Sequence, residues 1–352
     1  MRPSFLLLIT LFRLPLFPPS PVAAQAASTH PAVLRWEFIY TAADFASAHA
    51  STIAETEQGL VAAWFGGTRE GNVDVAIWLS RMVGGKWTAP VSVATGEQPD
   101  GTRYPCWNPV LAPWGDGTLR LFYKVGPSPA TWWGMLSVSR DGGRTWSRGE
   151  RLPEGILGPV KNKPVRLSDG TIVSPSSTES ADEVSRWRVH FELSGDSGRT
   201  WTKVAPPVLP SRVEPNAIQP TILVHRGDTL QALGRTRSGW IFETWSTNRG
   251  RSWSPLTLTQ FPNPNAGIDG VTLRDGRHLL VYNHTRQGRS QLYVALSDNG
   301  RAWRTALQLE NDPGEYSYPA IIQSRDGLVH VTYTWNRNHI MYVALDPGKL
   351  AR

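Results

Sequence analysis

The chain has 352 residues, a formal net charge of +7, 32 glycines, 28 prolines, 16 tryptophans and a single cysteine. This composition is typical of an all-β protein with many turns, and one cysteine excludes a framework of disulfides within the chain. The basic residues are spread out and do not form runs, which argues against nucleic-acid binding. The eight histidines lack metal-ligand spacing, so we expect neither a metal site nor a cofactor.

Residues 1–26 have the features of a secretory signal peptide. Arg2 is the positive start, residues 5–16 are mostly apolar, and residues 24–26 (Ala-Gln-Ala) offer a small-x-small cleavage site. The alternative, an uncleaved membrane anchor, is disfavoured because the apolar stretch is short and rich in proline. We therefore expect a secreted or periplasmic protein whose mature chain does not insert into a membrane.

A short motif recurs along the rest of the chain. Its full form, Ser-x-Asp-x-Gly-x-x-Trp, covers residues 139–146 and returns at 194–201. Asparagine replaces the aspartate at 246–253, and the copies at 80–87 and 298–303 keep only part of the pattern. The tryptophans fall at 87, 146, 201, 253 and 303, a period of about 50 residues that indicates a propeller or a solenoid. Five copies cannot be five active sites, so we interpret the motif as a hairpin turn.

Each repeat has the same strand pattern. Two apolar runs joined by a glycine-containing turn come first, and a third run leads into the motif. The paired runs cover residues 51–67, 109–126, 164–177, 220–235, 271–285 and 319–335, and a last third run at 339–347 lacks the motif. These segments predict one all-β domain over residues 30–347, a six-bladed β-propeller in which residues 34–40 add the outer strand of the last blade. A division into two domains is less favoured because no linker interrupts the repeat.

Propellers bind small ligands over the central axis, where the innermost strands converge. The first run of each repeat should be innermost, and the antiparallel run that follows returns to the same face. The starts of the first runs supply His49, Asn108, Lys161, Asn162, Lys163, Gln219, Asp269, Tyr316 and Tyr318. The ends of the second runs supply Arg69, Lys124, Arg235, Arg237, Asn283, His284 and Trp335. Most of these residues are polar and several are cationic, which predicts a binding site for an anionic ligand.

The six repeats and their motif resemble the exo-sialidase (neuraminidase) superfamily, in particular its bacterial BNR-repeat, Asp-box branch, over nearly the whole chain. The resemblance implies a glycan or oligosaccharide substrate and three arginines that bind its carboxylate. Arg235 and Arg289 match two of these arginines. His49 stands in place of the first, and Arg69 resembles a further arginine of the family.

The resemblance also suggests catalytic residues. Tyr316 resembles the nucleophilic tyrosine of the family, with Tyr318 as the close alternative. Gln219 stands where the family has the glutamate that assists this tyrosine. No aspartate clearly matches the general acid, although Glu70 and Asp74 lie near the expected position.

Three functions are compatible with these residues. In an exo-glycosidase, Tyr316 would be the nucleophile, Arg235 and Arg289 would hold the carboxylate, and Asp269 or Glu70 would be the acid/base. The base that activates the tyrosine would be Glu214, Glu315 or His49. In a lyase or atypical hydrolase acting at a uronic acid, Lys, Asn and Gln side chains would neutralise the uronate, while His49 or Tyr316 moves the C5 proton. The third function is carbohydrate binding without catalysis.

Overall fold

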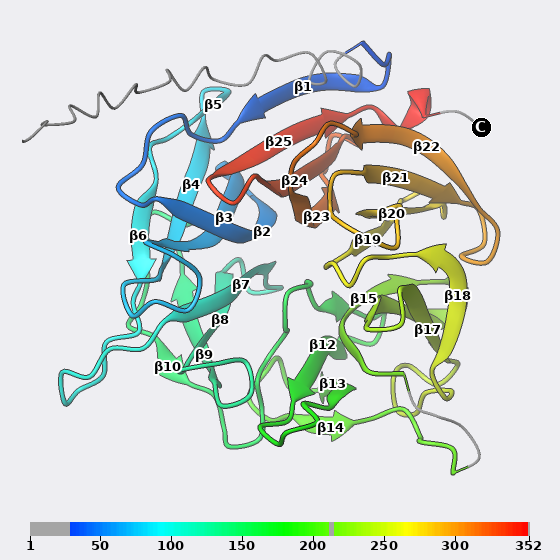
Figure 1. The fold of residues 1–352 in the computed structure, drawn as a ribbon, viewed down its shortest axis with the longest axis horizontal. Helices are drawn as coiled ribbons and strands as arrows, with labels where there is room; N and C mark the ends of the chain where they lie inside the picture. The colour runs from blue at the N-terminus through cyan, green and yellow to red at the C-terminus, as the bar shows by residue number, and fades with distance from the viewer. Residues whose placement is uncertain (1–28, 211–214, 351–352) are drawn as a thin grey trace, which may run out of the picture.

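A computed structural model describes residues 29–210 and 215–350. The expected signal peptide at residues 1–26 and the candidate base Glu214 therefore lie outside the described residues. The part of the chain that the structure describes forms six antiparallel sheets arranged as blades around one axis (Figure 1). Among the same residues, no helix has the length and apolarity needed to span a bilayer.

The blades follow one another along the chain, and in each the first strand is innermost. Blade 1 contains β2 (Ser47–Thr56), β3 (Gly59–Gly67), β4 (Ala76–Val83), β5 (Lys86–Trp87) and β6 (Val91–Ala94). Blade 2 contains β7 (Cys106–Pro113), β8 (Leu119–Val125), β9 (Trp133–Ser139) and β10 (Glu150–Arg151). Blade 3 contains β11 (Val165–Arg166), β12 (Ile172–Glu179), β13 (Trp187–Ser194) and β14 (Thr202–Val204).

The second half of the ring is more regular. Blade 4 contains β15 (Ala217–Val224), β16 (Leu230–Thr236), β17 (Trp240–Ser246) and β18 (Thr257–Pro262). Blade 5 contains β19 (Asp269–Thr272), β20 (His278–Asn283), β21 (Leu292–Ser297) and β22 (Trp303–Glu310). Blade 6 contains β23 (Tyr316–Gln323), β24 (Val329–Trp335), β25 (His339–Leu345) and, as its outer strand, β1 (Val33–Phe38). Two short 3-10 helices cover Arg226–Asp228 and Pro347–Lys349.

The ring closes through the first strand of the chain. β1 pairs antiparallel with β25, from Val33 opposite Leu345 to Phe38 opposite Met341, so both ends of the propeller share blade 6 (Figure 1). This confirms the predicted all-β, six-bladed propeller and its closure. Closure covers the outer edge of β25, which would otherwise present unpaired backbone groups.

The repeated motif forms the turn between the third and fourth strands of a blade. In blade 2, the Ser139 hydroxyl accepts a hydrogen bond from the Gly143 amide at 2.8 Å and donates one to Asp141 at 2.8 Å. Asp141 in turn accepts from the amides of Arg144 and Thr145, at 3.0 and 2.9 Å. The carboxylate therefore caps the turn, as the spacing predicted.

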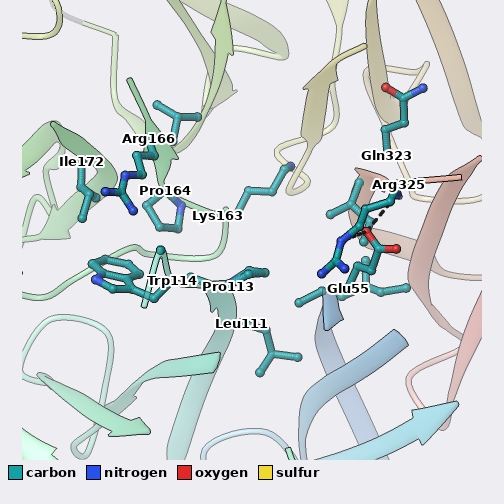
Figure 2. Close-up of a pocket in the computed structure, with 16 residues that line it drawn as sticks. Glu55, Leu111, Pro113, Trp114, Lys163, Pro164, Arg166, Ile172, Gln323 and Arg325 are labelled. Atoms are coloured by element: carbon teal, nitrogen blue, oxygen red, sulfur yellow. Dashed lines mark hydrogen bonds and ion pairs between the residues drawn. The ribbon is translucent and has the colours of Figure 1, made fainter. Parts of the chain in front are cut away.

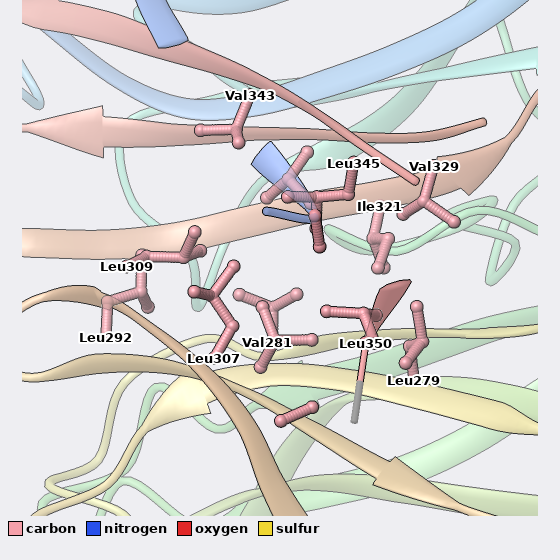
Figure 3. Packing of buried hydrophobic residues seen from close by; sticks show 14 of the residues in the cluster. Leu279, Val281, Leu292, Leu307, Leu309, Ile321, Val329, Val343, Leu345 and Leu350 are labelled. Carbon is pink, nitrogen blue, oxygen red and sulfur yellow. The ribbon is translucent and has the colours of Figure 1, made fainter. Parts of the chain in front are cut away.

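Apolar side chains fill the spaces between blades. The tryptophan of the fourth motif copy, Trp253, stacks on Phe191 of blade 3 with ring centroids 3.7 Å apart. The largest buried cluster joins blades 5 and 6 (Figure 3). There Val281 and Leu292 of blade 5 face Ile321 and Val343 of blade 6. These contacts fix neighbouring blades against each other and hold the inner ends of their strands in place.

Candidate functional site

Four innermost strands carry the same irregularity near the start of the strand. In β2, β7, β15 and β23 one extra residue interrupts the pairing with the next strand, a β-bulge. The first bulge residue has a positive φ in each case: Ala50 (55°), Asn108 (39°), Gln219 (56°) and Tyr318 (51°). Lys161, ahead of the short β11, also has a positive φ of 79°. Residues other than glycine adopt this backbone at a cost, and they cluster at functional sites. The bulges therefore mark this end of the axis as the candidate site.

Tyr318 is the centre of this site. Its ring centroid lies 4.2 Å from that of His49, and the guanidinium carbons of Arg235 and Arg289 lie 5.3 and 5.7 Å from it. Both arginines also donate to the Asn265 carbonyl oxygen at 3.1 Å, which holds the two guanidinium groups together. Two adjacent guanidinium groups form a suitable receptor for a carboxylate.

A third arginine, Arg337, comes from the loop between β24 and β25. Its Nε donates to both carboxylate oxygens of Glu315 at 2.9 and 3.0 Å, and Glu315 also accepts from Arg289 at 3.0 Å. Arg337 forms a further ion pair with Glu70, from the loop between β3 and β4. Three cations therefore meet two carboxylates at this end of the axis. We call Arg235, Arg289, Arg337 and Tyr318 the arginine cluster.

The cluster controls the charge of its neighbours. Burial raises the pKa of Glu315, but the hydrogen bond and charge of Arg337, with the charge of Arg289, bring it below the usual value. Burial lowers the pKa of His49 well below its ordinary value, and the arginines lower it further. Glu315 is therefore ionised, and His49 is a neutral imidazole whose Nδ1 lies 3.0 Å from Thr334 Oγ1.

Lys161 closes the axis directly behind the arginine cluster. Its ammonium donates to the Ile268 carbonyl at 2.8 Å and to Asn162 Oδ1 at 2.9 Å, and it also bonds the Pro319 carbonyl. Burial lowers the pKa of Lys161 to about 7. Its donors are thus occupied by the protein, and one of them holds Pro319, the residue that follows Tyr318 in β23.

Asp269 and Lys163 form a second layer on the axis. The Lys163 ammonium lies 3.0 and 2.8 Å from the two Asp269 oxygens, which also accept from the Thr221 hydroxyl and from the amides of Gly270 and Ile321. These bonds satisfy both oxygens of a carboxylate that is only 2 % exposed. The predicted acid/base Asp269 and the predicted ligand Lys163 are therefore placed in a buried ion pair, away from the arginine cluster.

Tyr316, the first choice for nucleophile, is not among the arginines. Its ring belongs to the apolar cluster of blades 5 and 6, 6.1 Å from the ring of Trp335. Regular strand alternation would turn residues 316 and 318 to the same side, but the bulge that begins at Tyr318 separates them. The structure thus places Tyr318 at the site and Tyr316 in the core.

Four other predicted binding residues also lie apart from the cluster. Lys124 is fully buried between blades 2 and 3 and donates to the Pro159 carbonyl at 2.7 Å. His284 bonds the Tyr282 hydroxyl on the outer side of blade 5, and Trp335 packs against Phe38 of β1. Arg237 lies over Trp187, 4.2 Å from its ring centroid, beside Arg235 at 5.1 Å from the same ring. These side chains reach the same end of the blades, but further from the axis.

The remaining predicted residues lie on or beside the bulges. Asn108 and Gln219 are buried, and Gln219 Oε1 has no hydrogen-bond partner within the described part of the chain. Arg69 and Glu70 are exposed in the loop between β3 and β4, where Asp74 accepts from the Thr68 amide at 2.7 Å. This loop therefore brings Glu70, and not Asp74, to the arginine cluster.

Sequence patterns missed Arg337 and Trp187. Arg337 lies in a tight loop with a φ of 59° and not at the end of a strand, so counting back from the repeated motif does not reach it. Trp187 starts a third strand, where the strand pattern points to packing and not to a ligand. Its indole N–H donates to Glu179 at 2.9 Å and its ring supports Arg235.

The opposite end of the axis holds a separate cavity of about 300 Å³ (Figure 2). Arg166 and Trp114 line one side of it, Glu55 and Arg325 line the other, and Lys163 lies between them (Figure 2). Asp269 and Lys161 separate this cavity from Tyr318. The two ends of the axis are therefore distinct environments.

The repeated motif and this axial geometry agree with a comparison to known families. Residues 58–331 match the family model described as "BNR repeat-like domain". The chain belongs to this family. Among proteins with curated descriptions, none matched the sequence.

Solved structures of sialidases superpose on this chain over most of its length. A Hadza microbial sialidase superposes with a TM-score of 0.74 at 18% identity, covering 90% of this chain and 69% of that one. The intramolecular trans-sialidase of Ruminococcus gnavus has a TM-score of 0.69 at 14% identity, covering 91% and 99%. A Dyadobacter fermentans protein of unknown function has a TM-score of 0.74 at 18% identity, covering 89% and 98%. The TM-scores show that this chain has the propeller fold of these sialidases.

Proposed function

We propose that the protein is an exo-acting glycosidase that removes a terminal carboxylated sugar from a glycan. The observation that carries this proposal is the convergence of two guanidinium groups, of Arg235 and Arg289, on Tyr318, with Arg337 linked to Arg289 through Glu315. A bidentate carboxylate is the anion that adjacent arginines bind best. The sialidase fold and the names of the superposed enzymes support a glycan as the bearer of that carboxylate.

Tyr318 is the proposed nucleophile in place of Tyr316. A tyrosine is neutral until it is activated, so it can attack a sugar whose carboxylate would repel an aspartate. His49 lies with its ring against Tyr318, but burial and the arginines hold its pKa well below the ordinary value and make it a weak base. The ionised Glu315, which Arg289 links to the cluster, is therefore the proposed acceptor of the phenol proton. Gln219 cannot take that role because an amide does not accept a proton near neutral pH.

Glu70 is the proposed acid/base on the substrate side. In the unliganded protein it forms an ion pair with Arg337. A substrate carboxylate held by the cluster competes with Glu70 for Arg337. Binding would thereby free Glu70 from the ion pair, so that its carboxylate can take up a proton from solvent and give it to the glycosidic oxygen.

The expected signal peptide suggests where the protein acts. We propose that the enzyme is exported and meets its glycans in the periplasm or outside the cell. Its test is to express the full chain and sequence the N-terminus of the mature protein. Cleavage near residue 26 is expected, and an intact N-terminus in the cytoplasm would contradict it.

A direct assay tests the reaction. The protein is incubated with 3′-sialyllactose, 6′-sialyllactose and uronate-terminated oligosaccharides, and free sugar acid is measured alongside absorbance from unsaturated uronates. We expect release of a saturated sugar acid. An unsaturated product would replace hydrolysis by a lyase reaction.

A second candidate function is carbohydrate binding without catalysis. Gln219 favours it, because Gln219 stands at the position where the resemblance places the glutamate that assists the nucleophilic tyrosine. Binding of these glycans by calorimetry, with no turnover, would establish it. An Arg235→Ala variant should abolish binding in that case as well, because the carboxylate receptor is common to both functions.

A further inference from the structure

A groove of about 220 Å³ lies between blades 2 and 3 on the same face as the arginine cluster. Its walls are the segment after β8, the segment after β10 and the end of β12. Trp132, Trp133, Pro153, Ile156, Thr178 and Glu179 line it. Glu179 is the last residue of β12, the second strand of blade 3, and Arg235 is the last but one of β16, the second strand of blade 4. Both residues therefore lie at the same end of the molecule.

Two side chains, Glu179 and Trp187, connect the lining of the groove to the arginine cluster. Glu179 accepts a hydrogen bond from the Trp187 indole N–H at 2.9 Å, and the Trp187 ring lies 5.1 Å from the Arg235 guanidinium. Burial raises the pKa of Glu179, while Arg235 and then Arg237 act in the opposite direction. Glu179 thus forms the boundary between the groove and the cluster.

Buried charges hold one wall of the groove in place. The Glu192 carboxylate, which is fully buried, accepts from the backbone amides of Leu157 and Gly158 at 2.8 and 2.7 Å. The buried Lys124 ammonium donates to the Pro159 carbonyl in the same segment. Gly134 lies so close that a Cβ there would be 2.5 Å from the Leu157 carbonyl oxygen. Such a fixed wall is what a preformed binding site requires.

The lining differs from the cluster in charge. Arg151 and Lys203 are balanced by Glu154 and Glu179, so the groove has no net charge of its own. Trp132 supplies an apolar indole ring, whereas the Trp133 ring is covered by the Arg151 guanidinium, 4.9 Å from its centroid. Thr178 and Glu179 supply hydrogen-bonding groups. Aromatic faces beside a few polar groups suit a sugar ring, which has an apolar C–H face and polar hydroxyls at its edge.

We propose that this groove is a second sugar subsite, which binds the neutral sugar adjoining the terminal carboxylated sugar. The inference rests on the proposed function for the identity of the terminal sugar only. The volume of the groove is below the about 300–1,000 Å³ of sites for drug-sized ligands. The groove therefore accommodates a short neutral part of a glycan and not a long chain. The subsite would thereby select glycans by the neutral sugar to which the terminal carboxylated sugar is attached.

Hydrolysis of two substrates with the same terminal sugar tests the subsite. The Trp132→Ala variant is compared with wild type on 3′-sialyllactose and on the methyl glycoside of the same sialic acid. We expect kcat/KM to fall about 10-fold on the oligosaccharide, as loss of one aromatic contact implies, and to change less than about 2-fold on the methyl glycoside. An equal effect on both substrates, or no effect on either, would overturn the proposal.

A matched control and a binding assay separate this inference from the proposed function. Trp245→Ala removes a half-buried tryptophan of blade 4 that lies under Arg301, away from the groove, and should leave both rates unchanged. Binding of lactose, cellobiose and N,N′-diacetylchitobiose is then measured by saturation-transfer NMR. Wild type and Arg235→Ala should bind at least one disaccharide, and Trp132→Ala should not. If wild type binds none, the subsite is refuted even where hydrolysis occurs; if it binds without hydrolysis, only the proposed function fails.

Discussion

Tyr318 owes its position to a single extra residue in β23. The bulge gives it a φ of 51° and turns its ring toward His49 and the arginines, while Tyr316, two residues earlier, packs in the core. The two tyrosines therefore form a natural matched pair, with the same side chain in different surroundings on one strand.

Replacing each tyrosine by phenylalanine separates their roles. We expect Tyr318→Phe to lower kcat by about 10³-fold or more, because a nucleophile cannot be replaced by its neighbours. Tyr316→Phe should keep activity within about 3-fold, since it removes only a hydroxyl outside the cluster. Steady-state kinetics with thermal melting as a folding control decides between them. Full activity in Tyr318→Phe would remove it from the nucleophile role.

Glu310 gives the protein a pH dependence unrelated to catalysis. Burial raises the pKa of Glu310 to about 7, although Tyr333 donates a hydrogen bond to it at 2.6 Å. Because the folded state holds this proton more tightly than the unfolded chain, its stabilising contribution is complete below about pH 4.5 and is lost as the pH rises through 7.

The Glu310→Gln variant should remove this contribution. Relative to the variant, the free energy of unfolding of wild type should fall by about 2–3 kcal/mol between pH 5 and pH 8.5. Urea unfolding of both proteins at several pH values measures the difference. Parallel curves would show that Glu310 is ionised in the folded state. Comparison with the variant is necessary because Lys124 and Lys161, whose pKa values burial lowers to about 7, act in the opposite sense.

At the level of single residues, the sequence predicted which residues lie near the candidate site better than it predicted their bonding partners. Counting back from the repeated motif led to His49, Arg235 and Tyr318, which do lie together. It also selected Lys163 and Asp269, because the sequence cannot show that two opposite charges will neutralise each other. A bulge likewise leaves no clear trace in the alternation of side chains.

Among the strands, β1 has the most specific task. Phe38 contacts the rings of Trp335 at 5.2 Å and His339 at 4.7 Å, so it joins β1 to the rest of blade 6. Leu34, on the same strand, is 47 % exposed. Leu34 lies at the bulge between Val33 and Arg35, where β1 is exposed, whereas Phe38 packs inward.

Substitutions at the exposed bulge and at the packed end of β1 should differ. Phe38→Ala should destabilise the protein by about 1–3 kcal/mol, less than for a fully buried phenylalanine, because the ring is only half-buried. Leu34→Ala should change the free energy of unfolding by less than about 0.5 kcal/mol. Chemical unfolding measures both. A similar effect of the two changes would mean that β1 contributes little to blade 6.

The elements themselves were the most predictable level. A motif with fixed serine, glycine and tryptophan positions has to form the same turn each time, so its period gave the number of blades. The shortest strands were less predictable. β5 and β10, in the outer parts of blades 1 and 2, and β11, the innermost strand of blade 3, are only two residues long, because only a short stretch of each pairs with its neighbour.

For the molecule as a whole, the axis is held by charge and not by apolar packing. Lys163 and Asp269 connect blades 3 and 5, and Asp269 also bonds Thr221 of blade 4 and Ile321 of blade 6. One carboxylate therefore joins four of the blades. Lys161 adds a second connection from blade 3 to blade 6.

Loss of this carboxylate should affect the whole ring. Asp269→Asn keeps the shape but leaves the Lys163 ammonium without its partner and points an amide donor at other donors. We expect destabilisation of about 3–5 kcal/mol, the range for breaking a buried ion pair. The midpoint of urea unfolding measures it, and Asp298→Asn, at an exposed ion pair, should change it little. If the two variants unfold alike, the axial ion pair is not needed for stability.

Closure of the ring by β1 has a consequence for biosynthesis. Val33 is made about 310 residues before its partner Leu345, so at translation rates of about 5–20 residues per second roughly 15–60 s pass before β1 can pair with β25. During that interval blades 1 to 5 can assemble, but the ring stays open and the edge that β1 offers is unprotected. Folding of this protein is therefore completed only after the last strand has been released, and the newborn chain depends on whatever shields its first strand until then.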